Sequence, residues 1–340
     1  MKILYAIQAT GNGHVSRANE VLPYLTQHGK VDVLLSGSNT QLILTNHPVK
    51  YYSKGLSLYC SKHGGLDYLK TLKNINPLRI LNDAKNLPVH LYDMVINDYD
   101  CITALACAIK KIPSISMSHQ AAFQSPLTPR PAHHNWIANK ILLYYAKATT
   151  YIGLHFKAYD SFIYEPIIKK NVLEAKSINK GHITVYLLCY CIKVLIQQFQ
   201  KCSQHKFQVF TASVSTITHY GNVQLMPLHT NLFTQSMITS SGVITGGGFE
   251  TPAEALHLGK KLMVIPIKGQ YEQECNAAAL ALMGVTVINK ITSNFNILFE
   301  EWIQANQPVT IRYHNNIPTI VDAVLQSYPS NYYHKNILYS

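Results

Sequence analysis

Hydrophobic runs alternate with amphipathic stretches through the first third of the chain. Residues 2–7 form an apolar run that leads into the turn Thr10-Gly-Asn-Gly13, and apolar positions recur at helical spacing over residues 14–28. Further strands are predicted at residues 31–35, 93–97 and 114–117, with a helix at 101–110. Strands separated by helices indicate parallel βαβ units.

A second alternating series begins near Gly181. It predicts strands at residues 182–188, 207–211, 223–226, 242–245, 262–266 and 285–288, and helices at 192–202, 252–258 and 271–282. This pattern is typical of a second Rossmann-like unit. We therefore predict an α/β protein with an N-terminal domain at 1–158, a linker at 159–180, a C-terminal domain at 181–326 and a tail at 327–340.

Composition narrows the class of protein. Hydrophobic residues make up 47% of the 340 residues, which excludes a disordered chain. No run approaches the ~20 apolar residues that span a bilayer, and Met1 is followed by a strand-like segment rather than a signal sequence, so we expect a cytoplasmic protein. The seven cysteines lack paired CxxC spacing and are expected to be free thiols.

The net charge of +12 arises from scarce acids, because charged residues make up only 14% of the chain. This balance favours an anionic partner, either a nucleotide or phosphate ligand or an acidic membrane surface. The basic residues form no dense cluster and no reading motif appears, so we do not expect nucleic-acid binding.

The turn after the first strand is the first candidate site. Gly11, Asn12 and Gly13 let the backbone approach a phosphate or an acceptor at the positive end of the following helix. The dinucleotide fingerprint is absent, because Ser16 stands where it requires glycine, and a tight turn without a ligand is the alternative. A helix N-terminus disfavours protonation of His14, which makes this residue a candidate general base; a capping or packing role is its alternative.

A second candidate site follows the predicted strand at residues 242–245. Three glycines there leave backbone N–H groups free to bind a diphosphate, and Thr251-Pro252 starts a helix. Glu254 has two interpretations, as the acid of a capping box or as the acceptor of both ribose hydroxyls. The donor-binding candidates in this region are Gly246, Gly247, Gly248, Phe249, Thr251, Glu254, Gln270, Gln273 and Asn276.

These residues resemble a known family. The stretch GGGFETPAEALHLGKKLMVIP, followed by QYEQECNA, is similar to the donor-binding signature of GT-B glycosyltransferases, above all of the family that includes the peptidoglycan N-acetylglucosaminyltransferase. The N-terminal GNGHVSRA resembles that family's Gly-rich loop with a His near the acceptor. The resemblance implies two Rossmann-like domains with parallel sheets that face each other across a cleft.

The resemblance also implies a hexosyltransferase mechanism. The glycine loop would face the diphosphate of a nucleotide sugar, most simply UDP-linked, Glu254 would contact the ribose, and Gln273 and Asn276 would touch donor sugar or phosphate. Inversion and independence from a metal cofactor are further implications. His14 is the expected base that deprotonates the acceptor hydroxyl, with Asp98 and His119 in reserve because each follows the carboxyl end of a predicted strand.

Two questions stay open at this point. Residues 131–151 combine apolar and aromatic side chains with Lys140 and Lys147, which suits an interfacial helix on the anionic inner face of the cell membrane, although a core helix with an aromatic stripe is the alternative. An NDP-sugar hydrolase or 2-epimerase of the same fold, and a nucleotide-sugar-binding protein without catalysis, are the competing functions.

Overall fold

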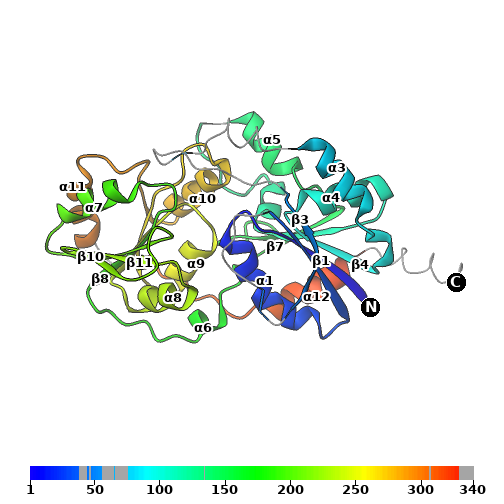
Figure 1. The fold of residues 1–340 in the computed structure, drawn as a ribbon, viewed down its shortest axis with the longest axis horizontal. Helices are drawn as coiled ribbons and strands as arrows, with labels where there is room; N and C mark the ends of the chain where they lie inside the picture. The colour runs from blue at the N-terminus through cyan, green and yellow to red at the C-terminus, as the bar shows by residue number, and fades with distance from the viewer. Residues whose placement is uncertain are drawn as a thin grey trace, which may run out of the picture.

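The computed structural model describes residues 1–37, 44–45, 47–55, 65, 76–133, 135–305 and 308–328. Figure 1 shows two α/β lobes side by side. The first contains β1 (Lys2–Gln8), α1 (Asn12–Leu25), β2 (Lys30–Ser36), β3 (Val49–Ser53), α3 (Pro77–Asn86), β4 (Met94–Asp98), α4 (Cys101–Lys110), β5 (Ile115–Ser118), α5 (Trp136–Tyr144), β6 (Thr150–Leu154) and β7 (Ile163–Tyr164), with 3-10 turns at Val89–Leu91 and Gln120–Gln124.

The connection between the lobes carries the short helix α6 (Lys170–Leu173). The second lobe then contains β8 (His182–Tyr186), α7 (Ile192–Gln200), β9 (Lys206–Thr211), β10 (Thr218–Tyr220), β11 (Val223–Pro227), α8 (Thr230–Thr239), β12 (Gly242–Thr245), α9 (Glu250–His257), β13 (Lys261–Val264), α10 (Tyr271–Leu282), β14 (Thr286–Val287) and α11 (Phe295–Gln304), and the last described helix is α12 (Ile317–Ser327).

Each lobe is built on a seven-stranded sheet of Rossmann type. The first has the order β3-β2-β1-β4-β5-β6-β7 and the second β10-β11-β9-β8-β12-β13-β14, and every pairing is parallel except that of the edge strand β10 with β11. Strand order therefore reverses direction beside β1 and β4 in one sheet and beside β8 and β12 in the other. Ligands of open α/β sheets bind at such switch points, beyond the carboxyl ends of the strands.

The sequence pattern accounts for the elements at the centre of each sheet. The six residues that follow Lys2 in β1 are all buried, as expected for a parallel strand covered on both faces. On α1, Val15, Ala18, Val21 and Leu22 form the predicted buried stripe.

The last helix packs on the first lobe. Although α12 falls within the range predicted for the second domain, it contacts α1, β5 and β6, and the hydroxyl of Tyr328 donates a hydrogen bond to the Pro113 carbonyl. Figure 1 shows α12 beneath α1 and β1. The chain therefore crosses between the lobes twice, once between β7 and β8 and once between α11 and α12.

Two expectations need correction, and one open alternative is decided. The predicted linker contains β7, which pairs with β6 and extends the first sheet to Tyr164. The helix within residues 131–151 is not a core helix, because Leu142 alone of its nine residues is buried. Cys189 is disulfide-bonded, whereas Cys101, Cys107, Cys191, Cys202 and Cys275 are free; Cys60 lies outside the described residues.

Candidate active site

The strands at the first switch point bring His14 and Asp98 together. His14 stands in the first turn of α1, directly after β1, and Asp98 is the last residue of β4. His14 Nδ1 lies 2.8 Å from Asp98 Oδ1. A carboxylate at this distance favours the proton on Nδ1, although Arg17 Nη2 also lies 2.9 Å from this atom; with Nδ1–H donating to Asp98, Nε2 carries the lone pair of a general base.

Arg17 completes this cluster. One turn after His14, its Nε lies 3.1 Å from Asp98 Oδ2 and its Nη2 lies 2.8 Å from Asp98 Oδ1. Arg17 Nη1 donates to Glu250 of the second lobe. Arg17 and Asp98 are both buried, and a buried ion pair is tolerated when hydrogen bonds satisfy its atoms. Asp98 is therefore held on two sides, by the imidazole and by the guanidinium.

The electrostatics of the pair correct one expectation. Burial disfavours charge on His14, but the Asp98 carboxylate outweighs burial and raises the pKa of His14 above 6.5. Burial works against the Asp98 carboxylate too, and Arg17 and His14 overcome it and lower the pKa of Asp98. The prediction that the helix N-terminus keeps His14 neutral is therefore wrong: its carboxylate partner dominates.

The other reserve bases have different surroundings. His119 is 1% exposed, with Nδ1 2.8 Å from the Leu154 carbonyl and Nε2 2.7 Å from Asn276 Oδ1. Its ring stacks on Phe249 of the second lobe with centroids 4.0 Å apart. Both ring nitrogens of His119 therefore contact protein atoms, and the residue joins the lobes rather than facing a substrate. Asp98 is buried and contacts His14 and Arg17, so it is placed to hold the His14 ring.

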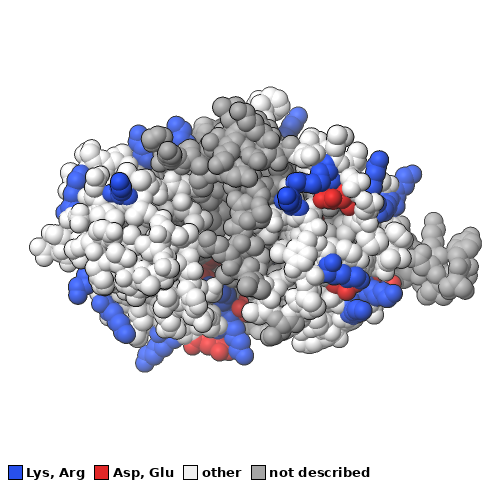
Figure 2. Space-filling view, in the orientation of Figure 1, with Lys and Arg blue, Asp and Glu red and all other residues white. Residues whose placement is uncertain are grey.

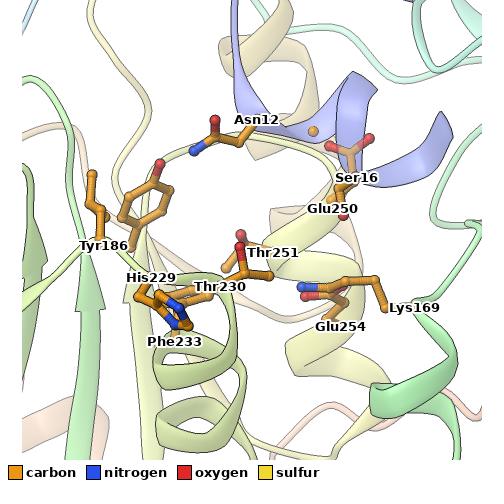
Figure 3. Close-up of a pocket in the computed structure, with 12 residues that line it drawn as sticks. Asn12, Ser16, Lys169, Tyr186, His229, Thr230, Phe233, Glu250, Thr251 and Glu254 are labelled. Carbon is orange, nitrogen blue, oxygen red and sulfur yellow. The ribbon is translucent and has the colours of Figure 1, made fainter. Parts of the chain in front are cut away.

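Two neighbouring cavities lie between the lobes. The first, of about 220 Å³, is shown in Figure 3, and the second has a volume of about 190 Å³. Both are lined by Asn12 and Gly13 from the first lobe and by Tyr186, Glu250 and Thr251 from the second. His14 lines neither cavity; its side chain is 13% exposed beside them. The predicted turn at Gly11–Gly13 therefore forms one wall of the cleft.

The glycine loop offers fewer amides than the sequence indicated. Gly246 N–H donates to the Tyr186 carbonyl and Gly247 N–H donates to Gln273 Oε1, so neither is free for a phosphate. By contrast, the N–H groups of residues 248–251 donate no hydrogen bond within the described part of the chain. These four amides stand at the start of α9, where the helix dipole favours an anion.

Three further donor candidates lie on α10 or at its N-cap. Gln273 Oε1 accepts from both Gly247 and Ile267, while its side chain also lines the second cavity. Asn276 is fully buried and donates to the Gly247 carbonyl. Gln270 stands at the N-cap of α10 without a side-chain capping bond and lines neither cavity. Asn276 is thus placed to shape the loop, while Gln270 begins α10 outside both cavities.

Glu254 belongs to the cavity and not to a helix cap. The helix begins at Glu250 after Phe249, without a side-chain capping bond, so the capping-box interpretation is wrong. Glu254 is 3% exposed and lines the first cavity, and its Oε1 pairs with Lys169 Nζ at 3.2 Å. Phe249, also a donor candidate, has its side chain buried against His119. Thr251 lines both cavities.

Sequence reasoning gave no role to Arg17, Glu250 or Lys169. Arg17 carried a signal, since it stands three residues after His14 and so on the same helical face. Glu250 and Lys169 carried none, because their partners Arg17 and Glu254 are 233 and 85 positions away in the chain.

Comparison with known proteins agrees with this architecture. The model of the family described as "Glycosyl transferase family 1" matches residues 1–297. The chain belongs to this glycosyltransferase family. No curated protein sequence matches it significantly.

Solved structures share the two-lobe fold. MurG of Acinetobacter baumannii is 16% identical with a TM-score of 0.58, covering 96% of this chain and 100% of its own. The UDP-GlcNAc 2-epimerase of Neisseria meningitidis, bound to UDP-GlcNAc, is 14% identical with a TM-score of 0.61 at the same coverage. UGT2 of Phytolacca americana, complexed with UDP-2-fluoro-glucose and pterostilbene, is 14% identical with a TM-score of 0.57, covering 95% and 94%. The glycosyltransferase thus has the predicted GT-B fold.

Proposed function

We propose that this glycosyltransferase moves a sugar from a UDP-linked donor to an acceptor hydroxyl with inversion. The observation that carries the proposal is the placement of Glu254 on the wall of the interlobe cavity, on the same helix whose first amides are free. A carboxylate can accept both hydroxyls of a ribose, and free amides at a helix N-terminus bind a diphosphate. The proposed contacts to the ribose and to the diphosphate therefore lie along one helix.

In the proposed reaction the first lobe supplies the base and the second lobe binds the leaving diphosphate. The acceptor enters from the side of His14, whose Nε2 removes the proton of its hydroxyl while Asp98 stabilises the imidazolium that forms. The hydroxyl oxygen attacks the anomeric carbon, and the bond from that carbon to the diphosphate breaks. The amides of residues 248–251 and the dipole of α9 stabilise the charge of the leaving diphosphate, so the proposed mechanism needs no metal ion.

A thermal-shift screen of nucleoside diphosphates and nucleotide sugars tests the donor site. Uridine compounds are expected to raise the melting temperature with concentration, because a ligand of the folded state stabilises it. Release of UDP that depends on an acceptor identifies a transferase. Release of UDP, or change of the sugar, without any acceptor would instead identify a hydrolase or a 2-epimerase, the alternative for which the epimerase neighbour gives structural precedent at the level of fold.

We further propose that α5 attaches the enzyme peripherally to an anionic membrane, where a glycan or lipid-linked acceptor of the cell envelope would be found. Trp136, Ile141 and Tyr144 on this helix are each at least 60% exposed. No Asp or Glu occurs between residues 101 and 159, a stretch with six Lys or Arg. Apolar side chains beside basic residues without acidic neighbours suit an anionic leaflet.

Outside this region Lys and Arg are spread over both lobes, as Figure 2 shows for one face. Among the described residues, no helix is long and apolar enough to cross a bilayer.

Tryptophan fluorescence tests this membrane contact. The chain has two tryptophans, and Trp136 is 60% exposed whereas Trp302 is 5% exposed, so a blue shift on adding phosphatidylglycerol vesicles reports on Trp136. We expect this shift in the wild type, its loss in Ile141→Asp, and its retention in Leu282→Asp, a matched change at an exposed leucine of the second lobe. Equal shifts with phosphatidylcholine vesicles, or an unaffected Ile141→Asp variant, would refute the contact.

A further inference from the structure

Lys169 reaches the donor cavity from outside both sheets. It lies on the connection between β7 and β8, directly before α6, and its Nζ is 3.2 Å from Glu254 Oε1 and 3.4 Å from Thr234 Oγ1 of α8. Figure 3 shows its side chain extending to Glu254 on the side of the cavity opposite Tyr186. Its side chain is only 15% exposed, so the ammonium group is largely withdrawn from water by this contact.

The charge of the Glu254 carboxylate depends on this lysine. Burial raises the pKa of the Glu254 carboxyl, Lys169 works against that rise, and the carboxylates of Glu250 on the same helix and Glu20 on α1 add to it. The other titratable groups on the wall of the same cavity are Tyr186 and His229. Lys169 is therefore the one cation among the described residues that pairs with this buried carboxylate.

The geometry divides the two carboxylate oxygens between two tasks. Oε1 is held by Lys169, and Oε2 has no hydrogen-bond partner among the described residues. Thr251 and Thr230 line the same cavity and can take part in a polar contact with a sugar ring. An ionised carboxylate accepts hydrogen bonds only, and accepts them more strongly than a neutral acid does, so a held and ionised Glu254 suits a vicinal diol.

We propose that Lys169 is a positioning residue that orients Glu254 toward the ribose diol and thereby makes the donor site selective for ribonucleoside over 2′-deoxyribonucleoside diphosphates. The inference rests on the proposed function, since it assigns the donor cavity to a nucleotide. It adds a preference for ribose over 2′-deoxyribose, which the fold alone does not determine. A site built to accept a hydroxyl discriminates against the analogue that lacks it, because the buried acceptor is then left unpaired.

Isothermal titration with UDP and 2′-deoxy-UDP between pH 6 and pH 9 tests the proposal. We expect the wild type to bind UDP about tenfold or more tightly than 2′-deoxy-UDP, the effect of one charged hydrogen bond. In Lys169→Met the ratio should fall toward one at pH 7. Its affinity for UDP should then recover as pH rises, because the pKa of Glu254 lies higher without its cation and ionisation requires more alkaline solution.

Two matched variants separate positioning from simple loss of charge. Lys170→Met removes the next lysine, whose side chain is 78% exposed and pairs with Glu174, and should leave affinity and selectivity as in the wild type. Lys169→Arg keeps the cation and should retain most of the selectivity. A Lys169→Met variant with wild-type selectivity and pH profile would overturn this inference alone, whereas a wild type that binds neither nucleotide would overturn the proposed function with it.

Discussion

His14→Ala is expected to lower kcat for sugar transfer by about 100- to 10,000-fold, the range that a general base contributes. Donor affinity should change little, because His14 lines neither interlobe cavity. His28→Ala, at an exposed position after the end of α1, is the matched control and should keep wild-type kcat. Steady-state kinetics combined with donor titration separates the two effects; a variant that transfers at the wild-type rate would remove His14 as the base.

The pH profile checks the same assignment. Since Asp98 raises the pKa of His14 above 6.5, the acid limb of kcat/KM should lie above pH 6.5, where the imidazole loses the proton that blocks its lone pair. Asp98→Asn removes the carboxylate, so the limb should move to lower pH while the maximal rate falls. A limb that does not move in this variant would show that another group governs it.

Arg17→Met is expected to lower the free energy of unfolding at pH 7 by about 3–5 kcal/mol, the cost of leaving a buried charge without its partner. Arg17 is 3% exposed and satisfies Asp98, while also contacting Glu250 across the cleft. Both carboxylates lose the guanidinium together, Asp98 keeps only His14 as an ion-pair partner among the described residues, and a methionine of similar length keeps the packing. Chemical denaturation measures the loss.

The loss should depend on pH in a defined direction. In the wild type the pKa of Asp98 lies below 3.8, so its stabilising effect is present above that value and disappears as the solution is acidified through the folded-state pKa. In Arg17→Met the buried carboxyl takes up a proton more readily, so the difference from wild type should shrink as pH falls. Arg17→Lys, which keeps the charge without the planar donors, should show an intermediate loss. A difference below about 1 kcal/mol at every pH would contradict the network.

The sequence predicted the fold well where its pattern is regular. The apolar runs of β1 and β4 predict buried parallel strands, and the apolar stripe predicts the helix α1. Together they indicate a Rossmann-like unit from the sequence alone. The position of α12 was not predictable in this way. Its apolar spacing indicates a buried face but does not indicate which lobe buries it, and the completed fold shows that it contacts α1, β5 and β6.

The candidate site was predictable to the level of residue types but not of roles. The turn before His14 and the start of α9 both follow strands at switch points, which a sequence reading can locate. Side chains from distant segments determine which backbone amides stay free for a ligand. For example, Gln273 Oε1 accepts the hydrogen bond of the Gly247 amide. Likewise, the position of Glu254 on the cavity wall and its ion pair with Lys169 become visible only in the fold.

The dissociation constant of UDP for the wild type and for Glu254→Gln tests the central claim most directly. Glutamine keeps the shape of the side chain but removes the charge that accepts the ribose hydroxyls. We predict saturable binding of UDP to the wild type and an affinity weakened about tenfold or more in the variant, equivalent to about 1.4 kcal/mol or more. Equal affinity in the two proteins, or no binding of UDP by the wild type, would contradict a nucleotide-sugar site between the lobes.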